Sequence, residues 1–225
     1  MKKGIIVTID GPSGSGKGTV ARVVAKRLGL SYLDTGAMYR AVALSAHRRG
    51  ISFDNDEKLS ELLSQVEIRF RDEGYSNQRV FLNGEDVTDE IRTSLISRLS
   101  SDIATKGVVR LHLKRMQREI GGERNIVAEG RDMGTYVFPD ADFKFYIDAA
   151  LDERARRRWL QLKERGIEAN LEEVRRDIEI RDRQDRERAE SPLHPASDAV
   201  IIDTTNLKVD EVVEKIIKII VLPRG

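Results

Sequence analysis

The first 28 residues combine a short apolar run with a helical periodicity. Residues 5–9 are nearly all β-branched and apolar, which is typical of a strand buried on both faces of a parallel sheet. Residues 11–16 are rich in glycine and interrupt this run. From Lys17 to Leu28, apolar side chains recur with a helical period. The pattern therefore predicts a strand, a glycine-rich turn and a helix.

A similar alternation continues along most of the chain. A short extended segment and several apolar strands are each followed by helical periodicity. Strands that alternate with helices indicate an α/β fold with a parallel sheet and right-handed crossovers. The predicted elements are strands at 31–33, 126–128, 143–147 and 199–202, the last three as core strands, and helices from 35 to about 49, over about 91–120 and over 209–221.

A different pattern lies between the predicted helix that ends at about residue 49 and the helical region that begins at about residue 91. Val66, Ile68 and Phe70 alternate with charged residues, as in a half-exposed antiparallel strand. The apolar segment 79–82 is followed by Asn83-Gly84, a favoured pair for a tight hairpin turn. The sequence thus predicts a small antiparallel β insertion over about 60–90. No linker suggests independent domains, so we expect one domain over 1–225.

Composition narrows the possible functions. The chain has 225 residues, with 39 Lys and Arg against 38 Asp and Glu, so its formal net charge is +1. This balance argues against a dedicated nucleic-acid binder, which is usually strongly basic. Cysteine is absent, which excludes disulfides, cysteine-ligated zinc and thiol catalysis. Without a membrane-length apolar run, we expect a cytoplasmic monomer that binds neither nucleic acid nor a membrane.

The glycine-rich turn fits the pattern G-x-x-x-x-G-K. Glycines let successive backbone N–H groups point inward, and the following helix adds the positive end of its dipole. Lys17 can then reach the outer phosphates as a mobile charge. The alternative is a turn without a ligand, but its place between a buried strand and an amphipathic helix favours a phosphate site. The predicted ATP-binding residues are Gly11, Pro12, Ser13, Gly14, Ser15, Gly16, Lys17, Gly18 and Thr19.

One position departs from the usual motif. The hydroxyl residue that normally follows the lysine and meets Mg²⁺ is replaced by Gly18, and the hydroxyl comes one position later, at Thr19. We therefore assign no metal ligand directly. We expect phosphates and water to hold Mg²⁺, and Thr19 to contact a phosphate.

Three other segments place charged residues where a ligand could bind. Arg40 follows a predicted strand and could bind an acceptor phosphate; the alternative is a helix N-cap at Thr35 with an ordinary surface arginine. Arg131 and Asp132 follow the next strand and could equally form a surface ion pair. Arg181, Asp185 and Arg188 share one helical stripe, in a segment that could also be a solvated charged helix.

Four motifs in order resemble the bacterial cytidylate kinase family: GPSGSGKGT (11–19), LDTGAMYR (33–40), EGRDMGTYVFPDA (129–141) and RDRQDRERAESPL (181–193). Their spacing agrees along essentially the whole chain and includes the β insertion. The resemblance implies a P-loop fold, and transfer of the γ-phosphoryl of ATP to CMP or dCMP with Mg²⁺, in pyrimidine nucleotide metabolism. It also implies a monophosphate-binding region at about 35–104 and a helical lid at about 149–168.

The resemblance further implies which residues contact the substrates. Cytosine offers an amino donor beside ring acceptors, so a carboxylate with an arginine or hydroxyl would read it and leave groups unpaired with uracil. The implied CMP-binding residues are Thr35, Tyr39, Arg40, Ser101, Arg110, Arg131, Asp132, Arg181, Asp185 and Arg188. The implied catalytic residues are Lys17, Arg131, Arg157, Arg158 and Arg188.

Several alternatives remain beside this interpretation. Arg154, Arg156, Arg157 and Arg158 could form a basic helix face balanced by Asp152, Glu153 and Glu164. An RNA-binding patch would need more aromatic partners than Trp159. A GTPase-like switch would need N-K-x-D and D-x-x-G, and neither occurs. A kinase for another nucleotide or a small metabolite would use the same loop. Asp148 and Asp203 each end an apolar strand, and we expect both to cap the following turn rather than to bind metal.

Overall fold

The protein is described from a computed structural model, which covers residues 4–73, 77–122 and 125–222. The chain forms two compact units. The first comprises Met1–Leu33 with Glu123–Gly225, and the second comprises Asp34–Gly122. Three expectations stay predictions: a single domain, a monophosphate-binding region at about 35–104 and a lid at about 149–168.

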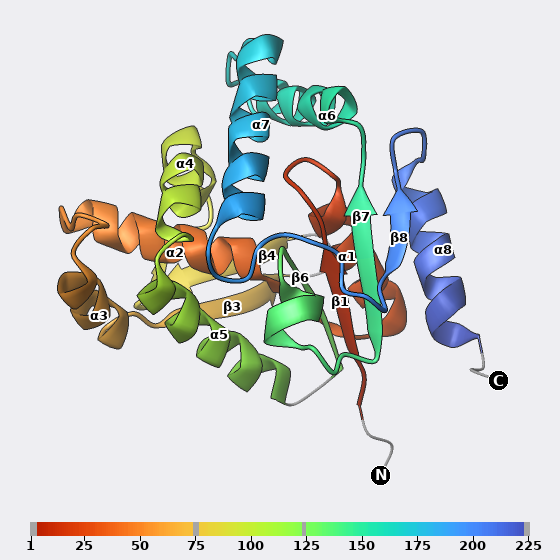
Figure 1. Ribbon diagram of the computed structural model, residues 1–225, viewed down its shortest axis with the longest axis horizontal. Helices are drawn as coiled ribbons and strands as arrows, with labels where there is room; N and C mark the ends of the chain where they lie inside the picture. The colour runs from red at the N-terminus through yellow and green to blue at the C-terminus, as the bar shows by residue number, and fades with distance from the viewer. Residues whose placement is uncertain (1–3, 74–76, 123–124, 223–225) are drawn as a thin grey trace. The chain divides into compact units, whose positions relative to one another are not determined.

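The first unit is built on a five-stranded sheet in the order β2-β6-β1-β7-β8. β1 pairs in parallel with β6 and with β7, and β7 pairs in parallel with β8. Figure 1 shows β7 and β8 pointing the same way, toward α6. The strands are β1 (Ile6–Asp10), β2 (Ser31–Asp34), β6 (Ile126–Gly130), β7 (Phe143–Asp148) and β8 (Val200–Asp203).

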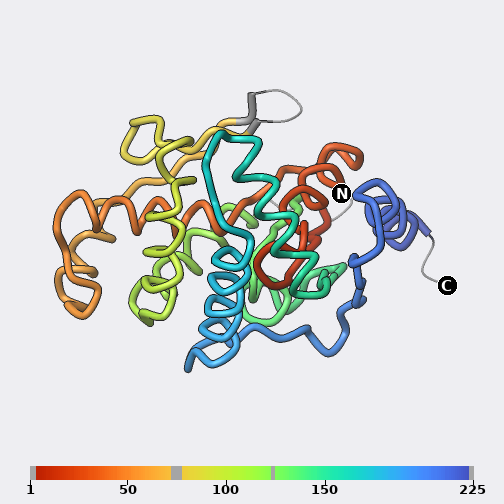
Figure 2. The backbone as a smooth tube through the Cα atoms, turned by 90° about the horizontal axis from the view of Figure 1, so that it is seen from above, coloured from red at the N-terminus to blue at the C-terminus, as the bar shows by residue number. Residues whose placement is uncertain are grey.

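Helices follow these strands, as the alternating pattern predicts. α1 and α8 pack with the sheet in one hydrophobic cluster that includes Ile9, Val24, Phe145 and Val213. α6 and α7 pack against each other around Ala155 and Ile178, and Figure 2 follows the chain from α6 (teal) into α7 (blue). The elements are α1 (Lys17–Leu28), the π-helical turn η2 (Met133–Val137), α6 (Leu151–Glu164), α7 (Leu171–Glu187) and α8 (Val209–Val221).

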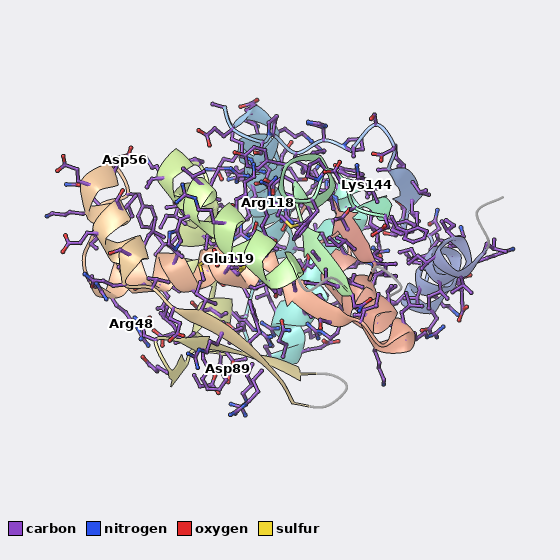
Figure 3. All side chains as sticks on the ribbon, turned by 90° about the horizontal axis from the view of Figure 1, so that it is seen from below. Arg48, Asp56, Asp89, Arg118, Glu119 and Lys144 are labelled. Atoms are coloured by element: carbon purple, nitrogen blue, oxygen red, sulfur yellow. The ribbon has the colours of Figure 1, made fainter. Side chains whose placement is uncertain are left out.

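The second unit contains the predicted antiparallel insertion as a three-stranded sheet in the order β3-β4-β5. Asn83 and Gly84 form its tight turn, both with positive φ (50° and 85°), as this pair favours. Arg48, which is labelled in Figure 3, lies at the end of α2. It ion-pairs with Glu85 of β5 and Glu90 of η1. The elements are α2 (Thr35–Arg48), α3 (Asp56–Ser64), β3 (Ile68–Glu73), β4 (Asn77–Leu82), β5 (Glu85–Asp86), η1 (Glu90–Arg92), α4 (Ser94–Ile103) and α5 (Gly107–Gly122).

Three local predictions need correction. Residues 60–64 are not part of the insertion but complete α3, which buries Leu59, Leu62 and Leu63. The helical region from 91 to 120 is interrupted, because α4 ends at Ile103 and α5 begins at Gly107. The strand at 199–202 was predicted as a core strand, but β8 is the edge of its sheet and leaves Ile201 63% exposed.

Within the described ranges, none of the helices has both the length and the apolar character that crossing a membrane requires.

Because β8 is an edge strand, two adjacent isoleucines should differ sharply in their contribution to stability. Ile202 is 7% exposed and packs in the main core, whereas Ile201 is 63% exposed. We expect Ile202→Ala to lower the free energy of unfolding by about 2–5 kcal/mol. Ile201→Ala, the matched control, should lower it by less than about 1 kcal/mol. Urea unfolding of both variants measures this, and equal losses would contradict the edge position.

Candidate active site

The glycine-rich loop joins β1 to α1, as its sequence predicts. Gly16 is the N-cap of α1 and has a φ of 87°, a left-handed conformation that side chains rarely adopt. α1 therefore begins with its first N–H groups facing the loop, where its dipole favours an anion. This arrangement matches a phosphate-binding turn.

Lys17 lies inside this loop. Its side-chain Nζ donates to the carbonyl of Pro12 (2.9 Å), and the residue is only 7% exposed. Burial, followed by the charge of Arg131, lowers the pKa of Lys17 to about 8, although carboxylates including Glu129 act in the opposite direction. The lysine thus approaches neutrality at mildly alkaline pH.

The glycine that replaces the usual hydroxyl residue has a steric reason. A Cβ at Gly18 would lie 3.0 Å from the Oε1 atom of Glu129. Glu129 is the penultimate residue of β6 and is almost completely buried, and its Oε1 accepts a hydrogen bond from the Tyr32 hydroxyl (3.2 Å). A carboxylate therefore occupies the space beside the start of α1. Glu129 belongs to the third motif, but the sequence does not indicate this role, because the role depends on Gly18, which lies 111 positions earlier.

Asp10 is another buried carboxylate that the sequence did not single out. It ends β1 and accepts hydrogen bonds from the backbone N–H groups of Met133 (2.9 Å) and Gly134 (2.8 Å). Burial raises the pKa of Asp10 to about 7, although the two N–H donors lower it. Asp10 thus holds the π-helical turn that follows Arg131 and Asp132.

Four of the residues predicted to bind CMP lie together in the first unit. The Nε of Arg131 donates to Asp185 Oδ2 (2.8 Å), and the Nη1 of Arg188 lies 3.3 Å from Asp185 Oδ1. Arg188 Nη2 is 3.9 Å from Asp132 Oδ1, and the Arg188 side chain is 4% exposed. Two guanidinium groups and two carboxylates therefore meet in one cluster, in which the side chains of Arg131 and Asp185 remain 26% and 16% exposed. Arg181 lies on the same helix, α7, half-buried.

The backbone after α7 holds Arg188 in this cluster. The Nε of Arg188 donates to the carbonyl of Ser191 (2.8 Å), and Ser191 has a positive φ of 49°. The N–H of Leu193, which is buried, donates to the carbonyl of Asp185 (2.7 Å). The SPL segment of the fourth motif is therefore a turn that folds back on α7.

The arginines of α6 divide into different environments. Arg156 is exposed and pairs with Glu153, as the alternative of a balanced basic face predicted. Arg157 also contacts Glu153, but its guanidinium donates to the backbone carbonyl of Thr204 (2.6 Å) and lies 3.4 Å from the carbonyl of Ser15 in the loop. Arg158 is half-buried.

In the second unit, Asp34 rather than Thr35 is the N-cap of α2. The Asp34 carboxylate accepts the N–H of Ala37 (2.8 Å) and a hydrogen bond from Arg40 Nη2 (3.0 Å). The alternative of an N-cap at Thr35 with an ordinary surface arginine is therefore wrong. Arg40 is held by this contact, and its Nε is buried with no hydrogen-bond partner among the residues that the structure describes. Thr35 is buried in the first turn.

The same unit brings Tyr39 and Arg110 together. The Arg110 guanidinium lies 5.8 Å from the centre of the Tyr39 ring, and its Nη1 donates to the carbonyl of Ala104 (3.2 Å). Arg110 is 2% exposed, which is unusual for an arginine. Ser101 lies on α4, half-buried.

The two strand-end aspartates cap turns, as expected. Asp148 accepts the N–H of Ala149 (2.7 Å), and Asp203 accepts both the N–H and the hydroxyl of Thr205 (2.8 and 2.6 Å). Over the described residues, no group of three or more His, Cys, Asp or Glu side chains is arranged to hold a metal ion.

Comparison with known proteins identifies the family of this chain. Residues 7–221 match the family described as cytidylate kinase. A cytidylate kinase from Geobacter sulfurreducens is 50% identical over 220 residues, which cover 97% of this chain and 94% of that protein. Cytidylate kinases from Desulfitobacterium hafniense (97% and 94% covered) and Bacillus cereus (98% and 97% covered) are 47% and 44% identical.

Solved structures show the fold alone. A Thermus thermophilus protein aligns with a TM-score of 0.50 at 20% identity, covering 97% of both chains. An uncharacterised protein from Eubacterium ventriosum aligns with a TM-score of 0.51 at 15% identity, covering 97% of this chain and 98% of the other. With a family match over nearly its whole length and relatives up to 50% identical, the chain belongs to the cytidylate kinase family.

Proposed function

We propose that the protein transfers the γ-phosphoryl group of ATP to CMP or dCMP and releases ADP with CDP or dCDP. The observation that carries this proposal is the charged cluster of Arg131, Asp132, Asp185 and Arg188, close enough to the loop for Arg131 to lower the pKa of Lys17. A phosphate loop beside buried arginines suits a donor triphosphate and an acceptor that is itself a phosphate.

The proposed reaction needs no dedicated general base. The acceptor phosphate oxygen of a nucleoside monophosphate is already anionic near neutral pH. Catalysis then consists of in-line positioning and neutralisation of charge on the transferred group. Lys17 and the loop N–H groups would hold the donor, while Arg131 and Arg188 would neutralise charge on the acceptor side, with Arg157 and Arg158 on α6 bracing the transferred group.

Mg²⁺ would accompany ATP rather than occupy a protein cage. No three-carboxylate or histidine group is available in the described part of the chain, and a Cβ at Gly18, where the usual hydroxyl residue would stand, would lie only 3.0 Å from Glu129 Oε1. Thr19 is exposed at the start of α1 and is free to contact a phosphate. When bound with ATP, the ion would neutralise charge on the phosphates.

The remaining residues that the family resemblance implies would serve the acceptor nucleotide. Arg40, oriented by Asp34, would bind its phosphate. Ser101 and Arg110 would donate to the ring acceptors of cytosine, and Asp132 would accept from its amino group. Arg181 and Asp185 would hold the sugar hydroxyls. Thr35 and Tyr39 would complete the acceptor residues, with the Tyr39 ring beside Arg110.

An acceptor panel tests the proposed function directly. With ATP and Mg²⁺, we expect CMP and dCMP to be phosphorylated at a kcat/KM at least about 10-fold above that for UMP, AMP or shikimate, because only cytosine satisfies both donors and acceptors of the site. Coupled ADP release and chromatography of the products measure it. Preferred phosphorylation of AMP or shikimate would contradict the proposal.

Asp132 should set the choice of base. Replacing it in Asp132→Asn turns one acceptor atom into a donor facing the cytosine amine, so the ratio of kcat/KM for CMP over UMP should fall by about 10-fold or more, with a smaller change in kcat. Asp140→Asn is the control, because Asp140 is an exposed aspartate eight positions away. A ratio that stays at its wild-type value would remove Asp132 as the reader of cytosine.

The pKa of Lys17 predicts how ATP binding depends on pH. A bound triphosphate favours the ammonium form, so affinity should be full below pH 8 and fall as pH rises through about 8, where the lysine of the empty loop loses its proton. For a non-hydrolysable ATP analogue, Kd should rise on the order of 10-fold between pH 8 and 9.5.

The comparison variant is Lys17→Ala, which should bind the analogue weakly and with no such pH dependence. Its kcat should also fall by about 100-fold or more, as on losing a preorganised charge. Calorimetry at several pH values measures both proteins. A wild-type Kd that is constant over this range would contradict the assignment to Lys17.

A further inference from the structure

Two buried side chains, from different helices, bind the backbone of one residue of the phosphate loop, Ser13. Asp182 of α7 accepts the N–H of Ser13 through Oδ1 (3.2 Å), and Arg154 of α6 donates from Nη1 to the carbonyl of Ser13 (2.9 Å). The two side chains also bind each other, with 2.5 Å between Arg154 Nη1 and Asp182 Oδ2. Both polar groups of Ser13 are therefore held by a single ion pair.

This ion pair is almost completely shielded from water. Arg154 is 5% exposed and Asp182 is 3% exposed. The Nε of Arg154 also donates to the carbonyl of Ala149, just before α6 (2.9 Å), so the guanidinium is bonded on two sides. Neither side chain belongs to the motif residues that contact substrate by resemblance.

The backbone of α6 also lies directly against the loop. A Cβ at Gly14 would lie 2.8 Å from the carbonyl oxygen of Arg154, and Gly14 has a φ of 76°. A side chain at this position would therefore both strain the loop and push α6 away from it. The glycine permits the close approach that lets Arg154 and Asp182 reach Ser13.

A buried ion pair is not by itself strong evidence for stability, because removing two charges from water is costly. The ion pair can instead fix the orientation of neighbouring groups, because charge-assisted hydrogen bonds hold the groups they join in a defined geometry. Arg154 and Asp182 fix the backbone carbonyl and N–H of Ser13. Ser13 precedes the loop N–H groups that would face the triphosphate. The pair is thus placed to orient the loop.

We propose that Arg154 and Asp182 are positioning residues for ATP. They act through the backbone N–H and carbonyl of Ser13 and connect the α6–α7 hairpin to the phosphate loop. The proposal rests on the proposed function for the identity of the ligand. It differs from a purely structural role because it predicts a selective loss of affinity for the triphosphate, with little change in affinity for CMP.

The test measures equilibrium binding of two ligands by calorimetry, the β,γ-imido analogue of ATP with Mg²⁺ and CMP. In Asp182→Ala, we expect Kd for the analogue to rise by about 10-fold or more, in line with the loss of charge-assisted hydrogen bonds. Kd for CMP should stay within about 3-fold of the wild type. In steady-state kinetics, KM for ATP should rise more than kcat falls.

A second ion pair between the same helices supplies the control. Asp152 of α6 lies 2.7 Å from Arg175 of α7, but it is exposed and does not contact the loop. Asp152→Ala should leave both affinities unchanged. If Asp182→Ala does not fold, Asp182→Asn decides, because it keeps the shape, removes the charge and turns one of the two acceptor oxygens into a donor. It should weaken binding of the analogue several-fold and leave CMP binding unaltered.

Wild-type binding of the analogue, or equal weakening of analogue and CMP, in the variant that folds would overturn the proposal. Failure of the proposed function would be observed differently. A wild-type protein that binds the ATP analogue but does not phosphorylate CMP would disprove the proposed reaction and not the positioning role. The binding measurements do not depend on turnover, so the two outcomes are separable.

Discussion

The arrangement of the first unit depends on the backbone of the loop between β1 and α1. A loop that binds phosphate must leave the N–H groups that face the phosphate unbonded by protein acceptors, so it cannot be held by ordinary secondary structure. Its conformation is instead held from outside. Arg154 and Asp182 bind the Ser13 peptide, and Arg157 lies at the carbonyl of Ser15. These contacts come from helices that follow β7, far along the chain.

This constraint explains why the unit carries so many buried charges. Asp10, Lys17, Glu129, Arg154 and Asp182 are all nearly excluded from water. Each has partners that compensate part of the cost of burial, as Asp10 does by accepting two backbone N–H groups. The uncompensated remainder appears in the shifted pKa values of Asp10 and Lys17. Such shifts often mark functional sites.

Local patterns in the sequence predicted the strand-turn-helix opening well, and the bounds of α1 agree exactly because both ends carry local signals. They predicted less where the outcome depends on distant contacts. The nine residues of α3 are too few to show a clear period beside the insertion. Ile201 is apolar, but its exposure follows from the position of β8 at the sheet edge, which strand composition does not reveal.

The candidate site divides in the same way. Arg131, Asp132, Asp185 and Arg188 were found through motifs, and the structure brings them together. Asp182 was hidden in a helix where most residues are charged, because its partner Ser13 lies 169 positions earlier. Glu129 was quoted within a motif but given no role, since only its proximity to Gly18 and Tyr32 reveals one.

The most direct measurement is a crystal structure with a non-hydrolysable ATP analogue and Mg²⁺. The account predicts that the triphosphate lies in the loop, within hydrogen-bond distance of its N–H groups, and that the Lys17 ammonium leaves the Pro12 carbonyl to bind it. A triphosphate bound elsewhere, with Lys17 still on Pro12, would contradict the account.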